Sequence, residues 1–315
     1  MDLKQIENIV MIEKEGSISK AADRLYITQS ALNQQLLHLE KELGVSLFDR
    51  VKRSMVPTMA GRIYLENAHR ILSIRDQTYK RISDISHEKT GEISITYTPE
   101  RGSRMFQTIF PVFHLLYPHI VFRIKEARNK EMETLLENRE VDLACLSYRS
   151  DNRNPLFSYI KGAREEYILG VPASHPMVRD VLPLSSPTAP LPTLDLRKLA
   201  DSPFILSTEV TRGYDMEQEM LRTAGITPPV LFKTQDSATR LAMVRQQIAS
   251  AFFPQAYMDL SAPIRYFHCE PFPAWTTCVA FRKDDYLTVP ELVLADLIRK
   301  YNVHALDHKG ILYSK

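Results

Sequence analysis

The chain has 315 residues, of which 44% are hydrophobic and 25% charged, so its composition is that of a globular protein large enough for two or three domains. The formal net charge of +2 is too small to indicate a nucleic-acid partner by itself, so any such site must come from local sequence patterns. No apolar run approaches the roughly 20 residues that span a bilayer, the first ten residues do not resemble a signal peptide, and three cysteines without a CxxC pair are too few for a disulfide scaffold, which favours a cytoplasmic protein with no membrane partner.

The first part of the chain has the pattern of short helices. Apolar residues recur at helical spacing from Leu3 onward, and the first helix is predicted to end near Gly16. Either Ser17 or Ser19 can cap a second helix. The pattern stops and restarts within a few residues, which indicates two helices joined by a tight turn.

A third helix is predicted to begin after Thr28, which can cap it, and to end at Gly44, which suits a left-handed position. Its apolar stripe consists of Leu32, Leu36, Leu39 and Leu43. Its other side carries four short hydrogen-bonding side chains, Gln29, Ser30, Asn33 and Gln34. Gln and Asn can bond adenine bidentately and Ser can bond bases or phosphates, so this side is typical of a major-groove reader. The alternative is a solvated helix face without a partner.

The next stretch, LFDRVKRSMVPTMAG, is interpreted as a strand, a basic turn and a second strand, which together form a small wing. Cations beside the third helix would bind the phosphates of a duplex. The candidate phosphate-binding residues are Arg50, Lys52, Arg53 and Arg62.

Thr58 can cap a long helix that continues to about Ser86. Seven positions in it alternate steps of four and three residues: Tyr64, Ala68, Ile71, Arg75, Thr78, Ile82 and Ile85. This spacing favours a coiled-coil seam between two copies of the helix, with defects at Arg75 and Thr78. The alternative is a single amphipathic helix that packs on its own domain.

On the residues GSISKAADRLYITQSALNQQLLHLEKELGVSLFDR and the later TMAG, positions 1–88 resemble the winged helix-turn-helix and linker helix of LysR-type transcriptional regulators. The resemblance implies a DNA-binding domain over 1–58 and a linker and dimerisation helix over 59–88. The predicted DNA-binding residues are Ser19, Thr28, Gln29, Ser30, Asn33, Gln34, Arg50, Lys52, Arg53 and Arg62. Asn33 and Gln34 stand where Ser and Arg are common in relatives, so the resemblance leaves the operator sequence open.

From Gly91 onward, strands alternate with helices, which favours parallel βαβ units and an α/β fold. The resemblance continues here and implies a two-lobed effector domain over 91–304, similar to periplasmic binding proteins. Lobe I would comprise 91–162 and 268–304, and lobe II would comprise 163–267.

Two features depart from the family pattern. The Pro/Ser-rich segment 181–195 replaces a usually short connection and is predicted to be an exposed, irregular loop. Gln247 stands where relatives usually have glycine, so the local turn is expected to differ.

A ligand in an open α/β fold lies beyond the carboxyl ends of the strands, where helix N-termini favour anions. Ser103 matches the hydroxyl position that relatives use for effector carboxylates, although Glu100 would oppose an anion, so a zwitterion or a cation stays open. The predicted effector-binding residues are Thr98, Arg101, Ser103, Arg104, Ser147, Gln235, Ser237 and Thr239. For the three hydroxyl residues Ser103, Ser237 and Thr239, helix capping is the alternative role.

The main hypothesis is a transcriptional regulator in which an effector alters the arrangement of the DNA-binding domains of a homodimer or homotetramer. Its predicted partners are promoter or operator DNA, a small-molecule effector with a carboxylate as the candidate class, a second copy of the chain, and RNA polymerase. The alternative is an enzyme built on the two-lobed fold. The sequence has no catalytic motif, metal-ligand spacing or cofactor fingerprint, so no catalytic residue, metal or cofactor is predicted.

Overall fold

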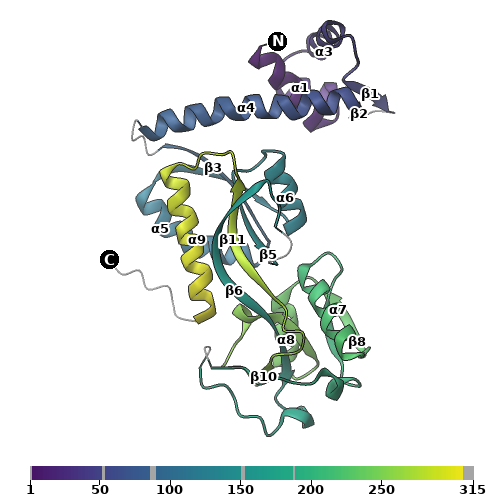
Figure 1. Cartoon of the computed structure of the whole chain (residues 1–315), viewed down its shortest axis with the longest axis vertical. Helices are drawn as coiled ribbons and strands as arrows, with labels where there is room; N and C mark the ends of the chain where they lie inside the picture. The colour runs from purple at the N-terminus through teal and green to yellow at the C-terminus, as the bar shows by residue number, and fades with distance from the viewer. Residues whose placement is uncertain (1, 52–53, 86–89, 150–152, 187–188, 308–315) are drawn as a thin grey trace. The chain divides into compact units, whose positions relative to one another are not determined.

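The computed structural model divides the chain into two units, Met1–Glu88 and Lys89–Lys315 (Figure 1). The residues that it describes are 2–51, 54–85, 90–149, 153–186 and 189–307. No helix in these ranges is both long enough and apolar enough to cross a membrane.

Within its described residues, unit 1 contains four helices and a two-stranded sheet: α1 (Leu3–Glu15), α2 (Ile18–Arg24), α3 (Gln29–Leu43), β1 (Phe48–Val51), β2 (Ser54–Pro57) and α4 (Met59–Ile85). The predicted helix ends are confirmed at Gly16 and Gly44, which both take the left-handed conformation. Ser17 is the N-cap of α2, but its side chain makes no capping hydrogen bond. β1 and β2 pair antiparallel from Phe48↔Pro57 to Val51↔Ser54, which forms the predicted wing.

The core of unit 1 lies between the first three helices and the start of α4. Leu32, Leu36 and Leu39 of α3 are buried against α1 and α2, as the apolar stripe predicted. Leu43, the fourth residue of that stripe, is 45% exposed because α3 ends there, beyond the reach of the other helices.

The first half of α4 packs on its own domain, which corrects part of the predicted seam. Tyr64 and Ala68 lie against the core of unit 1, and Arg75 forms an ion pair with Glu7 of α1. His69 is 2.7 Å from Glu13 of α1. The exposed stripe of α4 shares only Ile82 with the predicted seam: Ile63 is 55%, Ile74 66% and Ile82 58% accessible.

Unit 2 is a two-lobed α/β structure. Its first lobe contains β3 (Thr90–Tyr97), α5 (Arg101–Leu116), β4 (His119–Glu126), α6 (Asn129–Glu137), β5 (Leu143–Tyr148), β11 (Ala274–Arg282), α9 (Val289–Asp307) and the first part of β6 (Phe157–Pro172). The second lobe contains η1 (Pro176–Val178), η2 (Leu196–Leu199), β7 (Phe204–Ser207), α7 (Arg212–Ala224), β8 (Val230–Thr234), α8 (Ser237–Arg245), β9 (Ser250–Pro254), η3 (Gln255–Tyr257) and β10 (Ile264–Phe267).

One sheet passes through both lobes in the order β4-β3-β5-β11-β6-β9-β7-β8, and β10 also pairs with β6. β3 is parallel to β4 and β5, and β7 is parallel to β8 and β9, which confirms the α/β prediction. The long strand β6 pairs antiparallel with β11 up to Glu166 and with β9 from Tyr167 onward. β6 and β11 therefore connect the lobes (Figure 1).

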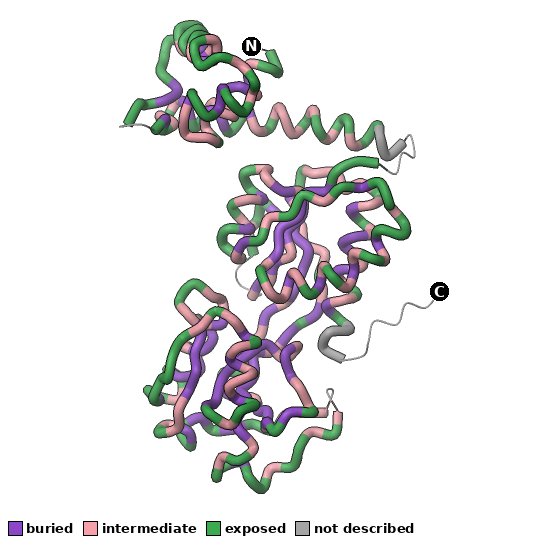
Figure 2. Tube along the Cα trace, turned by 180° about the vertical axis from the view of Figure 1, so that it is seen from behind, coloured by how far each residue is buried: buried purple, intermediate pink, exposed green. Residues whose placement is uncertain are grey.

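The helices cover both faces of the sheet. In lobe I, α5 and α9 enclose one buried cluster and α6 encloses another on the opposite face. Phe204, Phe252 and Phe253 are fully buried in the cores of lobe II. Figure 2 shows buried residues concentrated along the strands of this unit, with exposed residues on the outer surfaces of its helices and loops.

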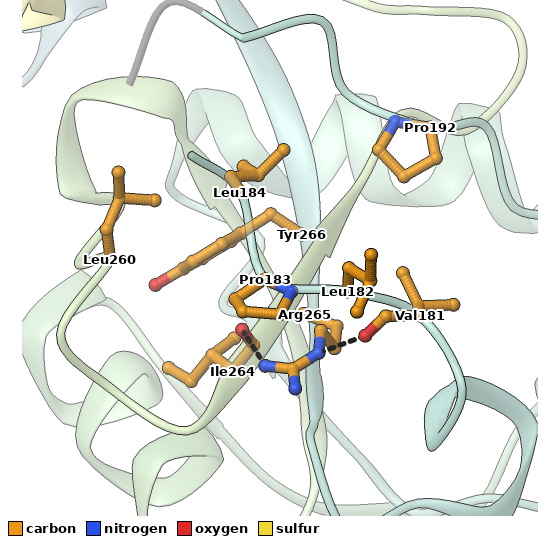
Figure 3. Close-up of a pocket in the computed structure, with 9 residues that line it drawn as sticks. All are labelled: Val181, Leu182, Pro183, Leu184, Pro192, Leu260, Ile264, Arg265 and Tyr266. Atoms are coloured by element: carbon orange, nitrogen blue, oxygen red, sulfur yellow. Dashed lines mark hydrogen bonds between the residues drawn. The ribbon is translucent and has the colours of Figure 1, made fainter. Parts of the chain in front are cut away.

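The described residues of the segment 181–195, which are 181–186 and 189–195, are irregular, as predicted, but they are partly packed against lobe II. Arg265 donates a hydrogen bond of 2.6 Å to the carbonyl of Val181 (Figure 3), and the backbone of His268 bonds Pro192 and Leu194. Leu184 packs against a buried cluster, whereas Leu182 is 83% exposed. The loop therefore covers strand β10 with part of its apolar side chains.

Gln247 takes a left-handed backbone with φ 62°, the conformation that glycine adopts most readily. Its side chain accepts a hydrogen bond of 2.9 Å from Ser174 N and donates one of 2.8 Å to the Pro263 carbonyl. These bonds tie two neighbouring loops to the turn and offset the backbone strain that a side chain costs at this φ.

Candidate functional site

The N-terminal turn of α3 is the first candidate site. The Thr28 hydroxyl accepts a hydrogen bond of 3.1 Å from Ala31 N, so the cap fixes where the helix begins. Gln29, Ser30 and Gln34 are exposed, and Ser30 and Gln34 lie on the side opposite the buried leucines. Because these polar groups follow one another at the start of the helix, they can reach base edges together.

The wing lies against the same side of α3. Arg50 of β1 donates a hydrogen bond of 2.7 Å to Asn33 Oδ1, so Asn33 is held by the wing. Arg62 is exposed and donates to the carbonyl of Pro57 at 3.2 Å. Ser19 is exposed on α2. The predicted phosphate-binding residues Lys52 and Arg53 lie outside the described residues.

Tyr26 is a residue of this region that the sequence reasoning missed. It lies in the turn between α2 and α3, is 95% exposed, and has a left-handed φ of 55°. A large aromatic residue is uncommon in that conformation. Its place in the turn beside Thr28 was visible in the sequence, but its exposure was not.

A cavity of about 1030 Å³ between the two lobes of unit 2 is the second candidate site. The carboxyl ends of β3 and β5 and the N-termini of α5, α7 and α8 all contribute residues to its wall. Of the predicted effector-binding residues, five line the cavity: Thr98, Arg101, Ser147, Gln235 and Ser237. The topology brings them together because parallel strands end at one edge of the sheet.

Three predicted residues lie outside this cavity, contrary to the prediction. Ser103 donates a hydrogen bond of 2.8 Å to Glu126 on β4, because Arg101 and Gly102 already occupy the cavity side of α5 and each later residue turns by about 100°. Thr239 donates to Asp236 at 2.5 Å and acts within the cap of α8. The guanidinium of Arg104 lies 5.1 Å from the ring centre of Tyr257.

Basic residues at the end of β4 also line the cavity. Arg128 and Lys130 flank the start of α6, and Arg212 lies in the first turn of α7, where burial lowers its pKa. β3 and β4 are parallel neighbours with Tyr97 opposite Glu126, so Thr98 and Arg128 follow the two strands at the same edge of the sheet. The place of Arg128 and Lys130 could have been predicted from the sequence. In a parallel sheet, the helix that follows β4 begins at the same edge as the helix that follows β3.

Glu100 joins the two lobes at the other side of the cavity. It is the N-cap of α5, has a positive φ of 54°, and does not cap its own helix. Its carboxylate accepts a hydrogen bond of 3.3 Å from Ser237 N, at the start of α8. Burial, and to a lesser degree the nearby Asp236 carboxylate, raise the pKa of Glu100.

Two buried ion pairs support the cavity. Glu165 of β6 is fully buried, pairs with Arg101, and accepts a hydrogen bond of 2.7 Å from Trp275 Nε1. In lobe II, Arg240 of α8 pairs with Glu217 of α7 at 3.0 Å, and both are almost inaccessible to solvent. These carboxylates neutralise Arg101 and Arg240, so both cations are committed to the fold.

The cysteines do not form a redox pair. Cys145 is opposite Val279 and Cys278 is opposite Leu146, so the two thiols lie on opposite faces of the sheet. Burial raises the pKa of both thiols, that of Cys278 to about 12, which keeps them protonated. In the part of the chain that the structure describes, no group of three or more metal-binding side chains occurs.

Comparison with known proteins gives consistent matches to both units. Residues 3–62 match the family model described as "Bacterial regulatory helix-turn-helix protein, lysR family", and residues 86–302 match the "LysR substrate binding domain". The uncharacterised regulator YcgK of Bacillus subtilis is 26% identical over 328 aligned residues, which cover 100% of this chain and 99% of that protein.

Solved structures share the fold at lower identity. A full-length OxyR variant from Pseudomonas aeruginosa has a TM-score of 0.67 and 20% identity, covering 95% of this chain and 98% of that one. Full-length CbnR in complex with its target DNA has a TM-score of 0.56 and 21% identity, covering 96% of this chain and 100% of that one.

Proposed function

This chain belongs to the LysR family of bacterial transcriptional regulators, and from that premise we propose which of its residues bind DNA and effector. As a member of that family it binds DNA through its helix-turn-helix domain, binds a small-molecule effector in its substrate domain, and forms oligomers. The proposed base readers are Gln29, Ser30, Asn33 and Gln34, with Ser19, Thr28, Lys52, Arg53 and Arg62 at phosphates and Arg50 on the wing beside Asn33. The observation that carries this proposal is the exposed row of polar side chains at the start of α3, beside the wing.

The proposed dimer interface is the exposed stripe of α4. Ile63 and Ile74 are eleven residues apart and Ile74 and Ile82 eight, which are close to three and two helical turns. Unit 1 leaves all three isoleucines exposed on one side of the helix. An exposed apolar stripe of this kind marks an interaction surface. A second copy of α4 would bury them and bring two copies of α3 to two half-sites.

Binding to duplex DNA should weaken steeply with salt, and the Ile82→Asp variant should show about half the wild-type slope. A dimer that neutralises several phosphates loses about 1,000-fold or more in affinity between 50 and 200 mM salt. A carboxylate in the interface would be desolvated without a partner, and the resulting monomer would contact about half as many phosphates. Fluorescence anisotropy against salt concentration, with sedimentation velocity for the mass, measures both effects.

The control is Leu182→Asp, which changes a leucine that is 83% exposed in unit 2 and should leave both mass and slope unchanged. A wild-type affinity that is indifferent to salt would contradict DNA binding. An Ile82→Asp protein that keeps the wild-type mass would instead contradict only the proposed interface.

We further propose that the effector carries a carboxylate that binds at Thr98, Arg128 and Lys130. The ends of β3 and β4 supply a hydroxyl and two cations to one wall of the cavity, and α6 begins there. Free N–H groups at a helix start add to the attraction for an anion. Gln235 would complete the site from lobe II.

The Arg128→Ala variant should bind carboxylate ligands roughly 10- to 100-fold more weakly than wild type, the loss expected for one charge-assisted hydrogen bond. Thermal shift with a panel of mono- and dicarboxylates and their amides measures this, since a ligand at 100 times its dissociation constant stabilises by about 2.7 kcal/mol. Arg123→Ala is the matched control, because Arg123 lies on β4, shortly before Arg128 in the chain, but pairs with Glu92 outside the cavity. Equal shifts for acids and amides would rule out the carboxylate.

A further inference from the structure

The hydrogen bond between the wing and α3 changes what Asn33 can recognise. An asparagine reads adenine with its oxygen and its amide N–H together, because the major-groove edge of adenine offers one donor and one acceptor. In this chain the Asn33 oxygen already accepts a hydrogen bond of 2.7 Å from Arg50. One lone pair of that oxygen is therefore engaged by the wing, whereas, within the described residues, both amide N–H groups of Asn33 stay free to face a base.

We propose that Asn33 and Arg50 form one composite reader that selects guanine, an inference that rests on the proposed DNA-binding function. The guanidinium has further N–H groups besides the one that bonds Asn33, so the pair presents several donors against the one lone pair left on the Asn33 oxygen. Guanine is the base whose major-groove edge offers two acceptors, N7 and O6, and no donor. Thymine offers a single acceptor beside a methyl group, so it satisfies the pair less well.

The surroundings of Arg50 leave its charge available. Within the described ranges, no carboxylate lies within ion-pair distance of it, and Asp49 precedes it on the strand and therefore points to the opposite face. The side chain of Asn33 is half-buried, so its movement is restricted. Arg50 is exposed, so its side chain can reach outward. The bond therefore links a fixed amide to an extended cation.

The other polar residues of α3 serve as an internal reference. Gln29 and Gln34 are exposed and, among the described residues, have no hydrogen-bond partner, so both keep an oxygen and an N–H free for a base. Gln29 can therefore read adenine in the ordinary way. A substitution of Gln29 should therefore change the base preference at a different position of the binding site from a substitution of Asn33 or Arg50.

The experiment is selection from a random duplex library with the full-length wild type and with Asn33→Ala, Arg50→Ala, Arg50→Lys and Gln29→Ala. Wild type should enrich a guanine that all three Asn33 and Arg50 variants lose, with discrimination falling roughly 5- to 150-fold at that position. Arg50→Lys keeps the positive charge but not the guanidinium fork, so it should retain affinity for random DNA while losing the guanine. Gln29→Ala should lose another position and keep the guanine.

Three results would overturn the inference. Loss of an adenine by Asn33→Ala would mean that Asn33 reads alone, and different positions lost by the Asn33 and Arg50 variants would mean that the two act separately. Uniform weakening by Arg50→Ala, with the guanine retained, would make Arg50 a phosphate contact. If the wild type enriches no sequence, the proposed function itself fails; circular dichroism of each variant shows that the fold is intact.

Discussion

Replacement of Arg240 by methionine is expected to destabilise unit 2 by about 3–5 kcal/mol at neutral pH, because it removes one partner of a buried ion pair. Arg240 donates to Glu217 at 3.0 Å and to Ser237 Oγ at 2.8 Å. Glu217 also accepts hydrogen bonds from Tyr167 and Ser207, so α7, α8, β6 and the end of β7 meet at this carboxylate. Denaturant unfolding followed by circular dichroism measures the loss.

The pH dependence of this loss identifies the buried charge as its cause. Burial raises the pKa of Glu217 above its ordinary value of 4.5, and the attraction of Arg240 counteracts that shift. Without Arg240 the pKa must rise further, and a raised carboxyl pKa contributes stability that is present at low pH and lost as the pH rises through it. The deficit of Arg240→Met should therefore be largest at about pH 8 and narrow toward about pH 4.5.

The double variant Arg240→Met/Glu217→Gln separates charge from packing. A neutral amide at position 217 can keep hydrogen bonds to Tyr167 and Ser207 without a counter-ion, so the double variant should recover part of the stability at about pH 8. A single variant that costs less than about 1 kcal/mol, or a double variant that is no better, would contradict the account.

Replacement of Gly61 by alanine should destabilise unit 1 by about 3 kcal/mol, near the upper end of what overpacking usually costs, and weaken DNA binding. A Cβ at Gly61 would lie 1.9 Å from the carbonyl oxygen of Leu47, which is backbone and cannot turn aside. That carbonyl accepts a hydrogen bond of 2.9 Å from Thr58 N, so the start of α4 is held on the segment before the wing. Thermal unfolding and DNA titration of the variant measure the two effects.

Gly44→Ala is the control for this prediction. Gly44 has a left-handed φ of 73° but open space where a Cβ would lie, so alanine there should cost only about 1–2 kcal/mol of backbone strain. If Gly61→Ala is no more destabilising than Gly44→Ala, the close approach of α4 to Leu47 is not what requires glycine.

Local sequence patterns were sufficient for the elements of unit 1 and for the α/β class of unit 2. Capping by Thr28 and the left-handed ends at Gly16 and Gly44 depend on neighbouring residues only, and the structure contains all three. The predicted seam of α4 was wrong in its first half because the burial of a helix stripe depends on residues that are distant in the sequence. Periodicity predicts that a stripe is buried, but it does not tell whether α1 of the same chain or a second chain covers it.

The residues predicted to bind the effector were likewise placed correctly only in part. That a cavity opens beyond the strand ends follows from the order of strands and helices, so the place of Thr98 and Ser147 in its wall could be predicted. The direction in which a side chain leaves a helix depends on the residue at which the helix begins. Sequence patterns locate that residue only to within a few positions, and each position turns the side chain by about 100°. Ser103 therefore lies outside the cavity, while Glu100 and Arg128 line it.

By itself, the sequence determined the two-part organisation of this regulator, its family and the polar residues at the start of α3, because these depend on local propensity and periodic patterning. Only the tertiary structure decided which polar groups are already engaged. The bonds from Arg50 to Asn33 and from Arg240 to Glu217 join residues 17 and 23 positions apart. Such pairs form because the fold brings distant segments within about 3 Å of each other, a distance that no local pattern encodes.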